Sequence, residues 1–189
     1  MVLVPTRVGY GVSGGPDVEN SGRCNSRDFA TVAATAAEQT VAILKTARKL
    51  PYVDLRRGLV VGQSFGGMTT IALAARGLPG LVGAINFAGG AGGNPREHPE
   101  KPCSAERLAA LYRSYGEVAQ VPTLWLYSEN DRYWGKQLPR QWFRGFVEAG
   151  GKGRFVQLPA YQDNGHGIFS GNPGAWRPAF ERFLAELGF

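Results

Sequence analysis

The stretch Leu59-Val60-Val61-Gly62-Gln63-Ser64-Phe65-Gly66-Gly67 decides the fold of this chain. Its three leading apolar residues are typical of a short buried strand. Residues 68–76 follow it, and their alanine-rich composition predicts a helix. A serine in a tight turn between a strand and a helix is the arrangement of a nucleophile elbow, with the pattern G-x-S-x-G. This turn is strained, and a side chain at Gly62 or Gly66 is expected to collide with the neighbouring strand or helix.

Ser64 stands at the apex of the turn. The turn is expected to lift its hydroxyl clear of the sheet, at the positive end of the following helix, where free backbone N–H groups can meet an oxyanion. A glycine-rich turn with an incidental serine is the alternative, because short G-x-S-x-G matches are common. The flanking strand and helix, and two residues later in the chain, favour a nucleophile.

Strands and helices are predicted to alternate along the chain. The strands are expected at residues 2–4, 58–62, 81–87, 121–127 and 154–158, and the helices at residues 29–50, 68–76, 104–115, 137–149 and 174–187. This alternation implies a mostly parallel sheet covered on both faces, a three-layer α/β/α sandwich with residues 1–189 in one domain. Residues 88–104 hold many glycines and prolines and are expected to form an irregular, mobile loop at the rim.

The composition, 43% hydrophobic and 19% charged, is ordinary for a soluble globular protein. No stretch approaches the roughly 18 consecutive apolar residues of a membrane span, and Pro5 and Arg7 interrupt the amino-terminal apolar residues too early for a signal peptide. The net charge is +6, but the arginines are scattered and form no nucleic-acid motif. We therefore expect no membrane or nucleic-acid partner, and a surplus charge that aids solubility and attracts acidic ligands weakly.

The cysteines and histidines predict no metal site. Cys24 and Cys103 form no C-x-x-C pair, and His98 and His166 are the two histidines of the chain. The glycines of residues 88–95 lack the spacing of a phosphate or dinucleotide loop, so no cofactor is expected. The cysteines fit two free thiols and equally one disulfide. The default compartment is the cytoplasm, whereas a disulfide together with a signal upstream of Met1 would imply the periplasm or secretion.

Ser64, Asp131 and His166 each come just after a predicted strand. In parallel sheets ligands bind beyond the carboxyl ends of the strands, so the three residues are expected to share one rim. A serine hydroxyl needs a base to take its proton, and the base needs an acid that holds it in the right tautomer. The sequence therefore predicts a serine nucleophile with His166 as the base and Asp131 as the acid.

Three other residues compete for these roles. Glu129 lies two residues nearer to its strand than Asp131, and Asp163 lies too close to His166 along the chain to reach around it easily. Asp131 fits the position of the acid best. His98 stands among proline and glutamate residues in the rim loop and is expected to be solvated.

Four motifs together resemble those of α/β hydrolases of the dienelactone-hydrolase-like group, in which the order of the three residues is also serine, acid, histidine. The resemblance spans essentially the whole chain and is most specific at the elbow and at the histidine. The motifs are Pro5-x-Arg7-x-Gly9-Tyr10-Gly11-x-Ser13-Gly14, Tyr52-Val53-Asp54 followed by the elbow, Leu126-Tyr127-Ser128-Glu129-Asn130-Asp131, and Gly165-His166-Gly167.

The resemblance implies a role for four residues. Ser64 is the nucleophile, and His166 is the general base and later the acid for the leaving group. Asp131 orients and stabilises the imidazolium, and the backbone N–H of Phe65 gives one oxyanion-hole donor. In this family a second donor comes from a loop after the third strand. That strand would precede Met1, so the chain is expected either to be a piece of a longer protein or to use another backbone group.

The first strands of such a sheet would also precede Met1. Residues 2–4 would then lie beside an exposed sheet edge, which a partner subunit in a homodimer could cover. The sequence thus supports two functions. The first is a serine hydrolase that cleaves a carboxylic ester, lactone or related acyl bond of a small molecule. The alternative is a truncated or degenerate hydrolase fold with a role in binding or assembly and little turnover.

Aromatic residues near the predicted rim suggest a partly apolar acyl or aryl pocket, although aromatic residues are more often part of a core. They are Tyr10, Phe65, Tyr133, Trp134 and Tyr161. A peptidase of the same fold is a weaker alternative, because the chain has no propeller or large cap that would select peptides.

Overall fold

The computed structural model describes residues 1–54 and 56–189. Four strands in it form one sheet: β1 (Gly58–Gln63), β2 (Leu81–Phe87), β3 (Thr123–Ser128) and β4 (Gly153–Leu158). The α-helices are α1 (Phe29–Ala47), α2 (Phe65–Ala74), α3 (Ala105–Val118), α4 (Leu138–Glu148), α5 (Ile168–Gly171) and α6 (Pro173–Glu186). Three short 3-10 turns occupy Gly11–Ser13, Cys24–Ser26 and Gly165–Gly167. None of the helices in these ranges is long and apolar enough to cross a membrane.

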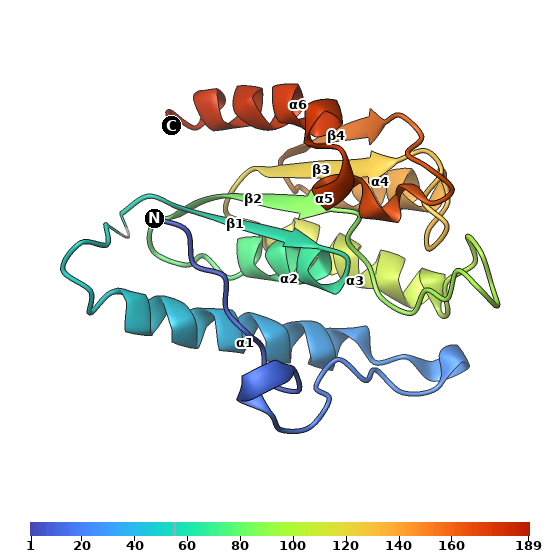
Figure 1. The fold of residues 1–189 in the computed structure, drawn as a ribbon, viewed down its shortest axis with the longest axis horizontal. Coiled ribbons are helices and arrows are strands. Elements are labelled where there is room, and N and C mark those ends of the chain that lie inside the picture. The colour runs from blue at the N-terminus through green and yellow to red at the C-terminus, as the bar shows by residue number, and fades with distance from the viewer. Residues whose placement is uncertain (55) are drawn as a thin grey trace.

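The sheet is parallel throughout, with the strands in the order β1-β2-β3-β4. A helix follows each of the first three strands and returns the chain to the amino end of the next one, as parallel pairing requires. Figure 1 shows all four arrowheads directed to the same side, where the loop of residues 88–104 and the loop after β4 also lie. The predicted parallel sheet is confirmed, and its carboxyl end collects the loops that carry the candidate residues.

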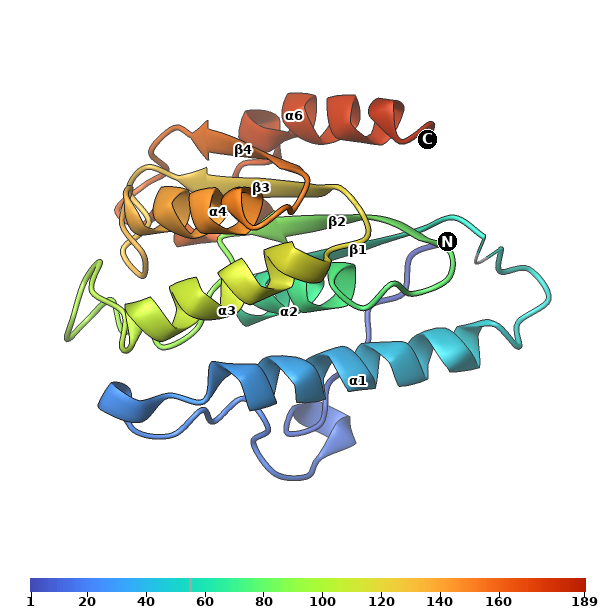
Figure 2. The same cartoon turned by 180° about the vertical axis from the view of Figure 1, so that it is seen from behind.

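Helices cover both faces of the sheet, because alternate strand residues point to opposite faces. Trp125 and Tyr127 of β3 pack into a cluster with α1, α2, α3 and α4. Leu124 and Leu126 of the same strand pack with α5 and α6 on the other face. Figure 1 and the reverse view in Figure 2 show these two helical layers on either side of the strands. The three-layer α/β/α sandwich is therefore confirmed.

Helix α1 lies outside α2 and joins the core through small residues. Its amino end is capped by the side chain of Asp28, which accepts a hydrogen bond from the Thr31 N–H. Its buried stripe consists of Phe29, Val32, Ala33, Ala36, Ala37 and Ala47. The alanines allow the close approach to α2 that larger side chains would prevent. The helix ends at Ala47, three residues before the predicted end.

The predicted strand at residues 2–4 is wrong. The structure has no strand there, and Val2 and Val4 are 85% and 88% exposed. A strand is stabilised by hydrogen bonds and side-chain packing from a neighbouring strand. In the described ranges no strand pairs with this segment, so its apolar sequence alone does not produce one.

Candidate active site

The backbone at Ser64 has the strained geometry of the predicted elbow. Ser64 is the residue before α2, and its φ of 55° and ψ of −122° lie in a region that costs a non-glycine residue about 1–3 kcal/mol. Hydrogen bonds hold it there. Its N–H donates to the Phe87 carbonyl at 2.9 Å, and its carbonyl accepts from the N–H groups of Gly90 and Met68, each at 3.1 Å. The end of β2 and the loop after it therefore fix the conformation of the serine.

Two glycines are crowded in this turn, and one of them differs from the expected pair. A Cβ at Gly62 would overlap the Gly66 carbonyl, as predicted. A Cβ at Gly66 would meet nothing nearer than Arg7 Nη1 at 3.7 Å, so the predicted collision there is wrong. The second crowded position is Gly67, where a Cβ would lie 2.7 Å from Gly89 Cα. In α2 the Cβ position of Gly66 faces away from the sheet, whereas that of Gly67 lies against the end of β2.

Asp131 and His166 form a hydrogen-bonded pair at this end of the sheet. His166 Nδ1 lies 2.9 Å from Asp131 Oδ2. The other carboxylate oxygen of Asp131 accepts the N–H groups of Tyr133 at 2.8 Å and Trp134 at 3.4 Å. The Asp131 side chain is fully buried. A buried carboxylate with several donors is fixed in position and keeps the imidazole in one orientation.

The loop that carries His166 is attached to the turn after β3 and to the end of β1. The Asn164 carboxamide oxygen accepts the N–H groups of His166 at 3.1 Å and Arg132 at 3.0 Å, which joins this loop to the turn after β3. The side chain of Gln63, the residue just before Ser64, donates to the His166 carbonyl at 2.7 Å. The elbow, the acid turn and the histidine loop are thus linked by direct hydrogen bonds.

Two aromatic rings enclose the imidazole of His166. The Tyr133 ring stacks on it with a centroid separation of 4.0 Å and an interplanar angle of 28°. The Trp134 ring meets it edge-on at 5.7 Å. Of the five aromatic residues expected near a pocket, these two touch the candidate base. Phe65 is buried in the larger core cluster, Tyr161 packs against the smaller one, and Tyr10 is exposed.

The Ser64 hydroxyl makes no hydrogen bond to any residue in the described part of the chain. Catalytic hydrogen bonds are often long before a substrate binds, so this does not remove Ser64 as a candidate. Phe65 is the first residue of α2, and the N–H at this position of a helix has no intrahelical acceptor. Its role as an oxyanion donor stays a prediction.

The competing residues lie elsewhere. Glu129 is paired with Lys136 at 3.0 Å, and the hydrogen bond from this ammonium group lowers the pKa of the carboxyl. Asp163 and His98 are exposed. His98 closes a short antiparallel bridge with Asn94 inside the rim loop. Among the described residues no three histidine, cysteine, aspartate or glutamate side chains gather as they would around a metal ion.

The sequence analysis did not identify a buried polar pair near the elbow, Asn86 and Tyr127. The Tyr127 hydroxyl donates to the Gly89 carbonyl at 2.7 Å and accepts from the Asn86 side chain at 3.1 Å. Burial raises the pKa of Tyr127 far above its usual value, so this donor stays protonated at all ordinary pH values. Because Gly90 holds the Ser64 carbonyl, the pair supports the elbow through the rim loop. In the sequence, Asn86 and Tyr127 look like ordinary strand residues.

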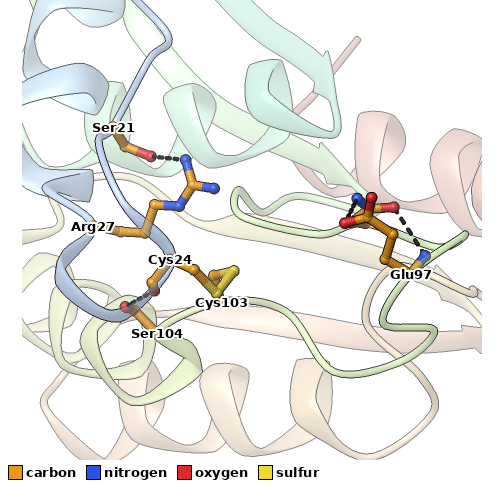
Figure 3. The surroundings of a disulfide bond; sticks show 7 residues. Ser21, Cys24, Arg27, Glu97, Cys103 and Ser104 are labelled. Atoms are coloured by element: carbon orange, nitrogen blue, oxygen red, sulfur yellow. Dashed lines mark hydrogen bonds between the residues drawn. A yellow bond between two sulfur atoms is a disulfide. The ribbon is translucent and has the colours of Figure 1, made fainter.

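Cys24 and Cys103 form a disulfide. It joins the loop before α1 to the rim loop, and Figure 3 shows it next to the hydrogen bond from the Ser104 hydroxyl to the Cys24 carbonyl. Of the two states that the sequence left open, the structure has the cross-linked one. Its two loops belong to the wall of an open cleft of about 610 Å³, and Tyr133 forms another part of that wall.

We expect loss of the disulfide to lower the stability of the protein markedly. Replacing Cys24 and Cys103 together by serine should reduce the free energy of unfolding by about 2–4 kcal/mol, because the bridge closes a long loop across 79 positions. Urea unfolding followed by circular dichroism measures this change. A thiol reductant should shift the wild type to the same midpoint and leave the double variant where it is. Equal midpoints for the oxidised wild type and the double variant would contradict the expectation.

Comparison with known proteins gives matches in structure and none in sequence. No protein-family profile matches the chain, and no curated protein matches its sequence. Esterase PE8 superposes with a TM-score of 0.58 at 21% identity, over 88% of this chain and 66% of that one. A protein from Klebsiella pneumoniae assigned as a dienelactone hydrolase gives 0.54 at 17% identity, over 84% of this chain and 61% of that one. Dipeptidyl peptidase 4 from Porphyromonas gingivalis gives 0.55 at 19% identity, over 82% and 22%.

These proteins have the α/β-hydrolase fold, and this chain spans between 22% and 66% of their lengths. The superpositions cover between 82% and 88% of this chain. The chain therefore has the α/β-hydrolase fold, in agreement with its resemblance to the dienelactone-hydrolase-like group.

Proposed function

We propose that this protein is a serine hydrolase that cleaves an ester, lactone or related acyl bond of a small molecule. The observation that carries the proposal is the 2.9 Å contact between His166 Nδ1 and buried Asp131 Oδ2, beside a serine held at a φ of 55°. A serine in a strained turn and a buried carboxylate–histidine pair at one end of a sheet act together in enzymes that catalyse acyl transfer. A structural role for this histidine would not need either feature.

The proposed reaction uses these residues in turn. His166 keeps a proton on Nδ1 for Asp131, so Nε2 is free to take the proton of the Ser64 hydroxyl as its oxygen attacks the acyl carbon. The N–H of Phe65 stabilises the oxyanion that develops. The protonated imidazole then returns its proton to the leaving oxygen, and an acyl-enzyme remains on Ser64. Water activated by His166 releases the acid and restores the serine.

The chemical class of the bond that is cleaved is suggested by the proteins of similar fold. Their names include an esterase, a dienelactone hydrolase and a peptidase. The cleft of about 610 Å³ beside Tyr133 is of the size that small ligands occupy. Ester and lactone bonds need less help for the leaving group than an amide bond does. This makes a small ester the first substrate class to test.

A fluorophosphonate probe tests the proposal directly, because it reacts covalently with an activated serine. Intact-mass analysis of the wild type is expected to show one adduct. Ser64→Ala should give none, and His166→Ala should react at least about 100-fold more slowly, since general base assistance contributes about 10²–10⁴-fold. Ser13→Ala is a suitable control, because Ser13 lies in the exposed amino-terminal loop. No adduct on the folded wild type, or an adduct that persists in Ser64→Ala, would overturn the proposal.

A further inference from the structure

The side chain of Gln63 connects the strand that leads to Ser64 with the loop that carries His166. Its Nε2 donates to the His166 carbonyl at 2.7 Å, across 103 positions of the chain. Within residues 1–54 and 56–189 this is the only hydrogen bond between the elbow, residues 62–67, and the histidine loop, residues 159–167. The Ser64 hydroxyl contributes none. Gln63 therefore provides the direct polar link between the candidate nucleophile and the candidate base.

The topology of the sheet explains why such a link is needed. Ser64 follows β1 and the histidine loop follows β4, and these are the two outer strands of the sheet. Neighbouring strands lie about 4.8 Å apart, so the loop has to cross the ends of β3 and β2 before His166 can approach the elbow. Figure 1 shows the loop passing the end of β3 on its way to α5. Asn164 holds the loop at the turn after β3, and Gln63 holds it at β1.

The position of Gln63 in its strand directs its side chain to the histidine loop. The Cβ position of Gly62 faces α2, and the next residue of a strand points to the opposite face. Gln63 is paired with Phe87 of β2, whose ring packs on that face against Phe169 of α5 and Trp176 of α6. The histidine loop runs directly into α5. A long, unbranched side chain that ends in an N–H donor is what this position requires.

We propose that Gln63 is a positioning residue, which holds His166 where its Nε2 can take the proton of the Ser64 hydroxyl. It touches neither the substrate nor the reacting atoms and acts through the main chain of His166. Asp131 fixes the imidazole at Nδ1, and Asn164 fixes the His166 N–H. The bond from Gln63 fixes the remaining main-chain group, the carbonyl. The inference rests on the proposed hydrolase activity, because it adds a residue to the same reaction.

Methionine at position 63 keeps the unbranched side chain and removes the donor. Gln63→Met is expected to react with the fluorophosphonate about 10- to 100-fold more slowly than the wild type, because a displacement of about 1 Å can cost 10²-fold in rate. In kcat/KM the loss should be larger for ethyl butyrate than for 4-nitrophenyl butyrate, since an alkoxide leaving group depends more on the proton that His166 returns. Equal losses for the two esters would indicate less folded protein and would overturn the proposal.

A second substitution at His166 shows whether Gln63 acts through this residue. Adding Gln63→Met to His166→Ala should change the rate of the fluorophosphonate reaction less than about twofold, because two residues that act as a unit are not additive. A further tenfold loss in the double variant would show that Gln63 supports Ser64 directly. That result would overturn the proposal.

Gln157→Met is the matched control. Gln157 is a half-buried glutamine of β4, and its Nε2 also donates to a backbone carbonyl of another element, that of Tyr127 at 2.9 Å. The same substitution therefore removes the same kind of bond away from the histidine loop. It should leave the fluorophosphonate rate and the preference between the two esters within about twofold of the wild type. A loss in Gln157→Met as large as that in Gln63→Met would overturn the specific role of Gln63.

An NMR measurement separates this inference from the proposed activity. The chain has two histidines, so a ¹⁵N-histidine label gives few ring signals, and His98→Gln assigns them. Gln63→Met should shift the ring signals of His166 and leave those of His98 unchanged. This shift without any fluorophosphonate adduct on the wild type would sink the proposed reaction and retain the positioning role. Unchanged His166 signals would overturn the positioning role, whatever the esters show.

A second variant covers the case in which methionine disturbs the packing around position 63. Gln63→Glu has almost the shape of the wild type, but its carboxylate accepts hydrogen bonds and cannot donate one. It should show the same slow reaction and the same shift of the His166 signals as Gln63→Met. Thermal unfolding of every variant identifies those that are folded. A folded Gln63→Glu variant that reacts at the rate of the wild type would overturn the proposal.

Discussion

Replacing Asp131 by asparagine is expected to lower kcat for ester hydrolysis by about 10³–10⁴-fold and to change KM little. The carboxamide has almost the same shape and can still accept the N–H groups of Tyr133 and Trp134 through its oxygen. Its NH₂ group then faces His166 Nδ1, which must become an acceptor. The proton moves to Nε2, and this nitrogen can no longer take the proton of Ser64. The same change lowers kcat by about 10⁴-fold in a well-studied protease with a serine, histidine and aspartate triad.

The control for this prediction is Glu129→Gln, two positions earlier in the same turn. Glu129 is exposed and is paired with Lys136, away from the imidazole. This variant should retain the kcat of the wild type within about twofold. Both variants should also be compared by thermal unfolding, so that a loss of activity is not a loss of fold. A kcat of Asp131→Asn within tenfold of the wild type would contradict the assignment of Asp131 as the acid, and a large loss in Glu129→Gln would favour the rival carboxylate.

The second large effect is expected at Gly62. A methyl group there overlaps the backbone carbonyl of Gly66, and backbone cannot turn aside as a side chain can. The Gly62→Ala variant should therefore lose about 3 kcal/mol of unfolding free energy, at the upper end of the range for overpacked sites. Its reaction with the fluorophosphonate should also slow, because the elbow must widen to admit the methyl group. Urea unfolding and intact mass provide the two measurements.

Gly66→Ala is the matched comparison, four residues further along the same turn. A methyl group there makes only an ordinary contact with Arg7, and the residue is the second of α2. Alanine in place of a helical glycine with a compatible backbone is neutral or stabilises by up to about 1 kcal/mol. The two glycines of one motif should thus differ by several kcal/mol. Similar losses in both variants would show that the turn does not have the geometry described here.

The sequence predicted most of the sheet because its signals are local. Short, largely apolar runs mark β1, β2, β3 and β4, and their bounds agree with the prediction to within two residues. Asp131 and His166 could be predicted to lie close together because each follows a strand. In a parallel sheet the carboxyl ends of the strands lie at the same edge. The error at residues 2–4 has a physical origin, because an apolar run becomes a strand only where another strand pairs with it.

Other features depend on the path of the chain in space, and the sequence alone does not decide them. Gly66 and Gly67 are adjacent glycines, and only the turn of α2 decides which of them faces the crowded end of β2. The pairing of Cys24 with Cys103 depends on two loops separated by 79 positions. Gln63 occupies a variable position of the elbow motif, and its bond to the histidine loop spans 103 positions. Such features are decided by the three-dimensional packing of the chain.

The disulfide also determines how this protein can misfold. A chain with two cysteines has a single intramolecular pairing, so oxidative refolding cannot yield scrambled monomers. The competing oxidised products are two or more chains joined through Cys24 and Cys103, which migrate at multiples of the monomer mass on a non-reducing gel. Refolding at low protein concentration should therefore return the native bond without an isomerase. Refolding under reducing conditions produces a molecule in which the loop before α1 is no longer tied to the rim loop.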